Sequence, residues 1–148
     1  MPNSSQPIPI DQLIPNHEPL IVNPRRRNGL ILYKRYHAEF AGPGAAVGKP
    51  FDLDCEFVLP VGDLELIHPE SDDARKRAYL IRRQWILLTR QITDNPDPLQ
   101  RAQRIIEQFE GFFGADTVAQ IPDEALALLV GVLPLTVRIV RYQFPNSA

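Results

Sequence analysis

The sequence predicts an α+β fold that is mainly helical. Residues 29–67 contain the alternation of apolar and polar side chains that is typical of strands, and they predict a short β-hairpin or small sheet. Residues 72–93 repeat apolar side chains every three or four positions, which predicts one long helix. Residues 98–143 continue this helical spacing in three shorter runs, at about 98–113, 122–130 and 134–143, which predict a compact tri-helical unit with residues 115–120 as a connection.

Length and composition are those of a globular protein. The chain has 148 residues, of which 44% are hydrophobic and 23% are charged, and this suffices for one domain with a buried core. No apolar run is long enough to span a bilayer, and the first residues lack the features of a signal peptide. The single cysteine, Cys55, excludes an internal disulfide framework and fits a reducing compartment. We therefore expect a cytoplasmic protein without a membrane partner.

The first 28 residues are rich in proline and predict an extended arm that precedes a single globular domain at residues 29–148. Proline disfavours regular helix, and the isolated apolar pairs fit either an arm laid on the domain or a partner, or a partly disordered leader. The arm ends with three consecutive arginines. They could hold phosphates as homeodomain arms do, or form a solvated charge run. These residues are Arg25, Arg26 and Arg27.

The β-rich part contains one clear strand pattern. Residues 29–40 fit both helical spacing and strand alternation, and we favour a strand. Residues 51–59, FDLDCEFVL, alternate strictly, with Asp52, Asp54 and Glu56 on one face. We interpret these carboxylates as a solvated or partner-facing stripe rather than a metal site. Cys55, on the opposite face, is expected to be an inert packing residue.

The long helix predicted over residues 72–93 begins at Ser71, a preferred N-cap residue, and its first turn is acidic. Its apolar stripe has the spacing of a coiled coil and could pair with its twin in a homodimer. The stripe consists of Ala78, Ile81, Trp85, Leu88 and Ile92. The opposite face gathers Arg75, Lys76, Arg82, Arg83 and Arg90. These cations could track a phosphate backbone or face the carboxylates of residues 51–73, and we favour the second interpretation.

The last apolar run, residues 121–142, contains two short helical patterns separated by Gly131. Glycine takes a positive φ without steric cost, and two short helices joined by such a turn form a helix-turn-helix unit. Four further residues match a common signature of this unit, namely Ala127, Val132, Val137 and Val140. The stretch therefore resembles the helix-turn-helix superfamily of DNA-binding proteins, and the resemblance is confined to residues 121–142.

The resemblance implies that the outward face of the second helix meets DNA. By analogy with the family, this face consists of Leu133, Pro134, Leu135, Arg138 and Ile139. Readout of bases in the major groove requires hydrogen-bond donors and acceptors, and Arg138 alone among these side chains supplies them. The pattern thus favours the helix-turn-helix scaffold more than it favours base reading.

Two hypotheses about function follow. In the first, the chain is a small regulator of transcription that associates with DNA as a homodimer. Its contacts would be Arg138, Arg141, Arg82, Arg83, Arg90, Arg25, Arg26 and Arg27. In the second, it is an adaptor that keeps the helix-turn-helix shape and binds a protein partner through Leu133, Leu135 and Ile139, because exposed apolar patches usually mark an interface.

Enzymatic chemistry has little support in the sequence. His17, His37 and His68 lie in separate segments without metal-ligand spacing. No serine occupies a nucleophile-elbow pattern, and no glycine-rich loop leads from a strand into a helix. We therefore expect no catalytic residue, metal, cofactor or small-molecule substrate.

Overall fold

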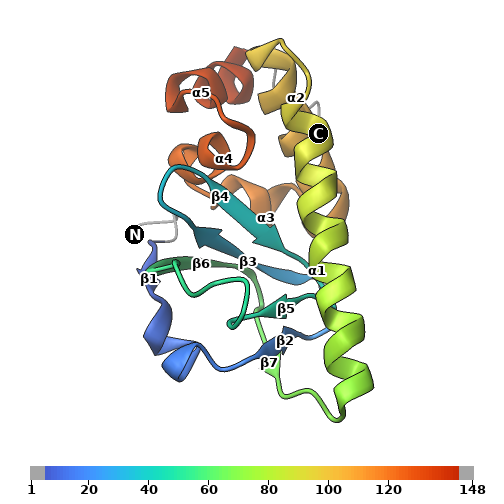
Figure 1. The fold of residues 1–148 in the computed structure, drawn as a ribbon. Coiled ribbons are helices and arrows are strands. Elements are labelled where there is room, and N and C mark those ends of the chain that lie inside the picture. Colours follow the sequence, from blue (N-terminus) through green and yellow to red (C-terminus); the bar gives the residue numbers. More distant parts are fainter. Residues whose placement is uncertain (1–5, 144–148) are drawn as a thin grey trace.

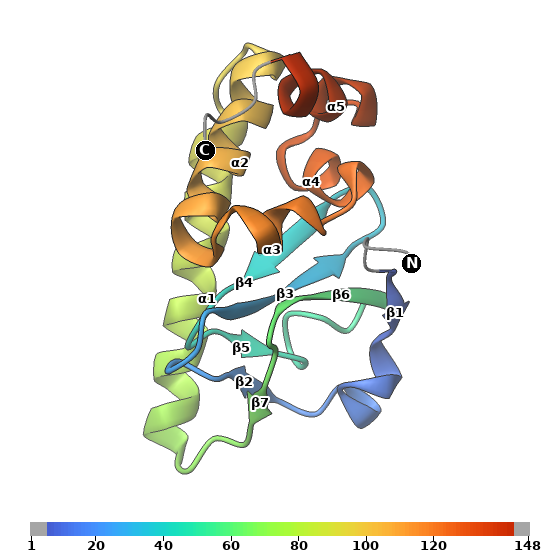
Figure 2. The same ribbon diagram turned by 180° about the vertical axis from the view of Figure 1, so that it is seen from behind.

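The computed structural model describes residues 6–143 and has an α+β fold. Among these residues are two small antiparallel sheets and five α-helices. The sheets occupy one half of the molecule and four of the helices the other, while the long helix α1 (Asp72–Thr93) runs along both halves (Figures 1 and 2). No single described helix is long and apolar enough to cross a membrane.

The four-stranded sheet has the order β1-β6-β3-β4, and the three-stranded sheet has the order β5-β2-β7. The strands are β1 (Ile8–Pro9), β2 (Leu20–Val22), β3 (Asn28–Tyr33), β4 (Ala38–Ala41), β5 (Ala46–Val47), β6 (Phe57–Gly62) and β7 (Leu66–Ile67). Because β1 pairs with β6 and β2 pairs with both β5 and β7, the predicted arm is not separate from the domain. From residue 6 onwards it is laid on the domain as part of both sheets, whereas residues 1–5 lie outside the described part.

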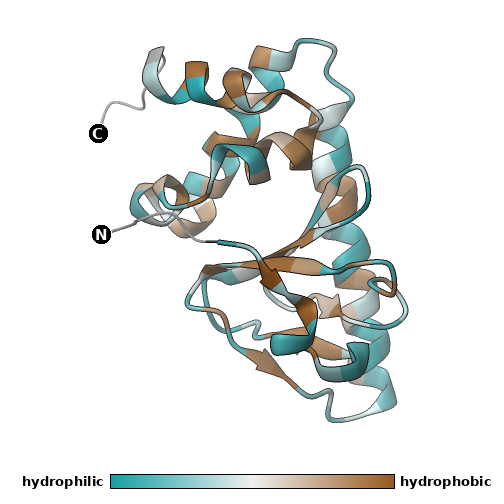
Figure 3. Cartoon of the chain, turned by 90° about the vertical axis from the view of Figure 1, so that its left-hand side faces the viewer, coloured by the Kyte–Doolittle hydropathy of each residue, from teal (hydrophilic) through white to brown (hydrophobic). Residues whose placement is uncertain are grey.

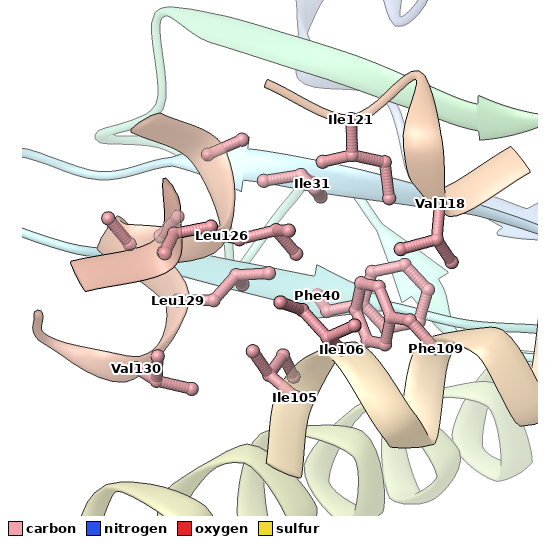
Figure 4. Close-up of a cluster of buried hydrophobic side chains, with 14 of the residues drawn as sticks. Ile31, Phe40, Ile105, Ile106, Phe109, Val118, Ile121, Leu126, Leu129 and Val130 are labelled. Atoms are coloured by element: carbon pink, nitrogen blue, oxygen red, sulfur yellow. The ribbon is translucent and has the colours of Figure 1, made fainter. Parts of the chain in front are cut away.

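The central strand β3 lies between two hydrophobic layers. Ile31 belongs to the core shared with the helices, whereas Leu30 and Leu32 belong to the core shared with the second sheet. The strands are accordingly apolar along most of their length (Figure 3). In the helix-facing core, Ile31 and Phe40 from the sheet meet Ile106 and other helical side chains (Figure 4). This sheet is therefore buried on both faces.

The strand predicted over residues 51–59 is wrong in its first half. Residues 51–54 form turns, and β6 begins only at Phe57. The burial departs from the prediction at two neighbouring positions, since Asp52 is fully buried while Leu53 is 62% exposed. Asp54 and Glu56 are exposed as predicted, but without Asp52 the three carboxylates do not form one solvated stripe. Cys55 is buried, as expected for a packing residue.

The helices agree closely with their predicted ranges. They are α1, α2 (Pro98–Phe113), α3 (Ala115–Ala119), α4 (Asp123–Val130) and α5 (Pro134–Gln143). Ser71 caps α1 by accepting the amide of Ala74 at 3.1 Å, and Asp97 caps α2 by accepting the amide of Leu99 at 3.0 Å. The segment expected to be a simple connection, residues 115–120, contains α3.

The apolar stripe of α1 packs inside the chain. Ala78 and Ile92 are buried, and Trp85 makes edge-on ring contacts with Phe40 of the sheet and Phe112 of α2. This stripe fastens α1 to its own sheet and to α2, so it is not a free surface for pairing with a second copy. The homodimer itself stays a prediction that needs another surface.

Candidate functional site

The turn between α4 and α5 is held in a defined geometry. Gly131 ends α4 with φ 69° and ψ 43°, and the axes of the two helices are bent by 113°. Arg101 of α2 donates from Nε to the carbonyl of Val130 at 2.9 Å and from Nη2 to that of Gly131 at 3.0 Å. A guanidinium that binds the last carbonyls of a helix stabilises its end. Nothing in the local pattern of α2 marks Arg101 for this role, because its partners lie 29 and 30 residues away.

The predicted inward and outward faces of α5 are confirmed by burial. Val137 is fully buried and Val140 is 3% exposed. On the outward side, Leu133 is 70% exposed and Leu135 is 58% exposed, while Ile139 is half-buried. The two leucines therefore present apolar surface at the start of α5.

The arginines of α5 are both drawn toward α4. Arg141 is largely buried and donates to Asp123 Oδ1 at 2.7 Å and to the carbonyl of Val118 at 2.9 Å. Arg138 is more exposed, and its Nε lies 3.5 Å from Asp123 Oδ2. Arg141 thus serves the packing of α5 instead of facing outward as the DNA hypothesis required. Arg138 is the more accessible of the two.

The prediction that Arg82 binds nucleic acid is wrong, because this side chain is fully buried. Its guanidinium bonds Asp52 through Nη2 to Oδ1 at 2.8 Å and through Nη1 to Oδ2 at 2.9 Å, and it reaches Glu39 at 2.7 Å. Lys34 adds a contact to Asp52 at 3.0 Å. Pairing with the acidic segment, the interpretation favoured from the sequence, therefore holds for Arg82. The four charges fasten the turn at residues 51–54 to α1 and to the sheet.

These contacts also set the ionisation of Asp52. Burial acts to raise the pKa of this carboxyl, but the hydrogen bonds and charge of Arg82, with a further contribution from Lys34, lower the pKa below its usual value of 3.8. Asp52 is therefore a structural anion.

The remaining predicted arginines do not gather on one surface. Arg83 and Arg90 are exposed on α1. Arg25, Arg26 and Arg27 are exposed in the connection from β2 to β3, which lies in the sheet half of the molecule and away from α5 (Figure 1). Arg26 is also paired with Asp63 at 2.8 Å and with Glu65 at 3.2 Å. A continuous phosphate-binding face made from the whole predicted set is therefore absent among the described residues.

A groove of about 420 Å³ adjoins the turn between α4 and α5. Leu128 and Val132 line it from the helical unit, Ile86 and Arg90 from α1, and Tyr36 from the β3–β4 hairpin. Tyr36 is 81% exposed, and the guanidinium of Arg90 has no hydrogen bond or ion pair within residues 6–143. Leu133 follows directly after Val132, the last residue of the groove wall.

The acidic group in the groove wall is already engaged. Glu39 accepts from Arg82 at 2.7 Å and lies 3.2 Å from His37 Nε2. The charge left without a partner in the groove is therefore that of Arg90. The groove thus combines apolar walls with one accessible cation.

The usual metal-ligating side chains do not gather in the described part of the chain. No group of three or more His, Cys, Asp or Glu side chains there is placed to hold a metal ion. His17 Nε2 lies 3.3 Å from the carbonyl oxygen of Cys55 and not from its sulfur. Burial raises the pKa of the Cys55 thiol to about 11, which keeps the sulfur in its unreactive protonated form.

Comparisons with protein-family models, with curated proteins and with solved structures found no match to this chain. The groove and the exposed start of α5 are therefore the features from which its function is inferred.

Proposed function

We propose that this chain is a non-enzymatic adaptor that binds a partner protein through the groove and the adjoining start of α5. The observation that carries this proposal is the exposure of Leu133 and Leu135, at 70% and 58%, beside an apolar groove. Exposed apolar side chains beside a groove cost free energy in water and are typically covered by a partner. The helix-turn-helix shape then serves as a support for the contact surface.

The chemistry of the groove defines the partner that it fits. Leu128, Val132 and Ile86 offer apolar walls, so the occupant presents apolar side chains. Arg90 has no acidic partner within residues 6–143, so the occupant also supplies a carboxylate. Grooves between helices commonly accept the apolar face of an amphipathic helix. We therefore assign an amphipathic helix of a partner protein, with at least one acidic residue at its edge, to this groove.

Association with DNA is the competing hypothesis, and one observation supports it. The 113° bend between α4 and α5 lies within the range of the helix-turn-helix motif. Against it stand the engagement of Arg141 with Asp123 and the burial of Arg82, which remove two of the eight predicted contacts. Leucines at the start of the second helix offer no hydrogen bond to a base edge. Protein recognition is therefore the better-supported function.

The test is a selection of displayed helical peptides against the full chain, followed by titration of the enriched peptides. We expect these peptides to combine apolar residues with Asp or Glu. Leu133→Asp should weaken their binding at least tenfold, because it places a carboxylate in the apolar contact. Leu87→Asp is the matched control, since Leu87 is 51% exposed on α1 and does not line the groove.

A charge exchange tests the assigned cation. Arg90→Glu should weaken the selected peptides, and replacing their acidic residue by lysine should restore binding to this variant. Equal binding to wild type and Leu133→Asp, or enrichment of basic peptides, would contradict the proposal. Binding of a mixed-sequence duplex that falls steeply with salt and is lost in Arg138→Gln would instead favour DNA. Self-association that disappears in Leu133→Asp would make a second copy the occupant.

A further inference from the structure

We propose that a second cavity, at the sheet end of the molecule, binds a small amphipathic anion. The cavity has a volume of about 590 Å³, which lies within the range of small-molecule sites. The connections from β2 to β3 and from β7 to α1 form its sides, and the first half of α1 closes it. This location is remote in the fold from the α4–α5 turn (Figure 1), so the inference does not rest on the proposed function.

Two arginines at the rim carry charge that the fold leaves unused. Arg25 and Arg77 line the cavity, both are exposed, and neither guanidinium has a hydrogen bond or ion pair within residues 6–143. Arg26, the neighbour of Arg25 in sequence, differs because it is already paired with Asp63 and Glu65. Two cations that line one cavity from separate segments attract an anionic group and can hold it by charge-assisted hydrogen bonds.

The other polar groups at the cavity limit what it accepts. The side chain of Asn23 is engaged, since it donates to Glu65 at 2.6 Å and accepts the amide of Arg25 at 2.9 Å. His68 lies 3.7 Å from Glu18, and Glu70 adds one carboxylate to the wall. The two arginines and Glu70 together carry a formal charge of +1. This balance favours a ligand with a single negative group placed between the arginines.

The floor of the cavity is apolar. Ile21, Ile67, Ala78 and Ile81 line it, and the first three of these belong to one hydrophobic cluster. An inorganic ion would leave this surface in contact with water, whereas a ligand with an apolar body would cover it. The ligands that fit the cavity therefore share one feature, a carboxylate, sulfonate or phosphate attached to an aromatic or aliphatic body.

Fluorescence titration with anilinonaphthalene sulfonate tests this assignment, because the probe joins an aromatic body to one sulfonate. Phenylnaphthylamine, a related ring system without the sulfonate, is the neutral control. We expect the double variant Arg25→Gln/Arg77→Gln to weaken the sulfonate roughly tenfold or more, since one lost charge-assisted hydrogen bond alone costs about that factor. Binding of the neutral probe should stay within twofold. Arg83→Gln, which changes an exposed arginine of α1 outside the cavity, should leave both affinities unchanged.

Methyl chemical shifts locate the bound probe. Saturation should shift the methyl signals of Ile21, Ile67 and Ile81 and leave that of Ile86, which lines the groove, in place. Decanoate should compete with the sulfonate, whereas inorganic phosphate at equal concentration should not. Equal sulfonate affinity in the double variant, or shifts confined to Ile86 and the helical unit, would overturn the assignment. Displacement of the probe by a short duplex at low salt would also overturn it, because the arginines would then belong to a nucleic-acid surface.

Discussion

Replacement of Arg82 by methionine should destabilise the fold strongly. The guanidinium makes two bonds to the buried carboxylate of Asp52, at 2.8 and 2.9 Å, and one to Glu39 at 2.7 Å. Removing one partner of a buried ion pair costs about 3–5 kcal/mol, because the other charge stays buried without compensation. Here Asp52 keeps Lys34 at 3.0 Å and the amide of Gly48 at 2.8 Å. We therefore expect a loss near the lower limit, about 3 kcal/mol.

The measurement is urea denaturation of the Arg82→Met, Asp52→Asn and double variants. The two side chains contact each other directly, so the double variant should lose less free energy of unfolding than the sum of the single losses, by about 1–3 kcal/mol. Arg83→Met is the matched control, because Arg83 is the exposed neighbour of Arg82 and should change stability by no more than about 0.5 kcal/mol. A loss below about 1 kcal/mol in Arg82→Met, or strict additivity, would refute a stabilising role for this pair.

Three further predictions follow from the same structure. Because the pKa of Asp52 is lowered in the folded state, its stabilising effect is present above the usual value of 3.8 and is lost as the pH falls through the folded pKa. Asp52→Asn should therefore reduce the loss of stability on acidification. Circular dichroism between about pH 5 and about pH 2 would measure this loss. Cys55, whose thiol pKa is about 11, should resist iodoacetamide at about pH 8 in the native protein and react once urea unfolds it, as mass spectrometry would show. Gly131→Ala should cost about 1–2 kcal/mol in urea denaturation through its left-handed backbone alone, since an added Cβ would meet nothing within 4 Å. The helical control Gly111→Ala, equally open, should instead stabilise by about 0.5–1 kcal/mol.

The helices were predictable because their signals are local. The N-cap of α1, the Asp97-Pro98 start of α2 and Gly114 after its end all act within a few residues. The observed ranges Asp72–Thr93 and Pro98–Phe113 accordingly match residues 72–93 and 98–113. Tertiary packing did not displace these boundaries.

The strands were harder to predict because burial on two faces removes the alternation that marks a strand. Leu30, Ile31 and Leu32 are all fully buried, two against one layer and one against the other, so β3 reads as a continuous apolar run. Residues 51–54 show the opposite case, in which an alternating pattern does not form a strand. Their alternation is regular, but Asp52 turns inward to Arg82, 30 residues away, and no local pattern encodes that partner.

The same limit applies to the candidate site. The phase of α5 could be predicted, since the burial of Val137 and the exposure of Leu133 follow from helical spacing. The roles of the arginines could not, because each depends on a distant partner. Arg141 reaches Asp123 across 18 residues, and Arg101 reaches Val130 across 29. The sequence therefore predicted which face of α5 is exposed, but not which arginines are paired within the fold.

The long helix α1 contributes to both proposed sites, and the buried ion network lies between them along this helix. Arg77 lines the anion cavity and Arg90 lines the groove, 13 residues further along, which is about 20 Å in an α-helix. Arg82 fixes the intervening turns of α1 to the sheet through Asp52 and Glu39. Coupling between two sites requires an element with two arrangements, and the buried ion pairs of Arg82 oppose a second arrangement of α1. We therefore expect ligand binding at the groove and ligand binding at the cavity to be independent, so failure of the peptide selection and failure of the sulfonate titration each bear on one proposal alone.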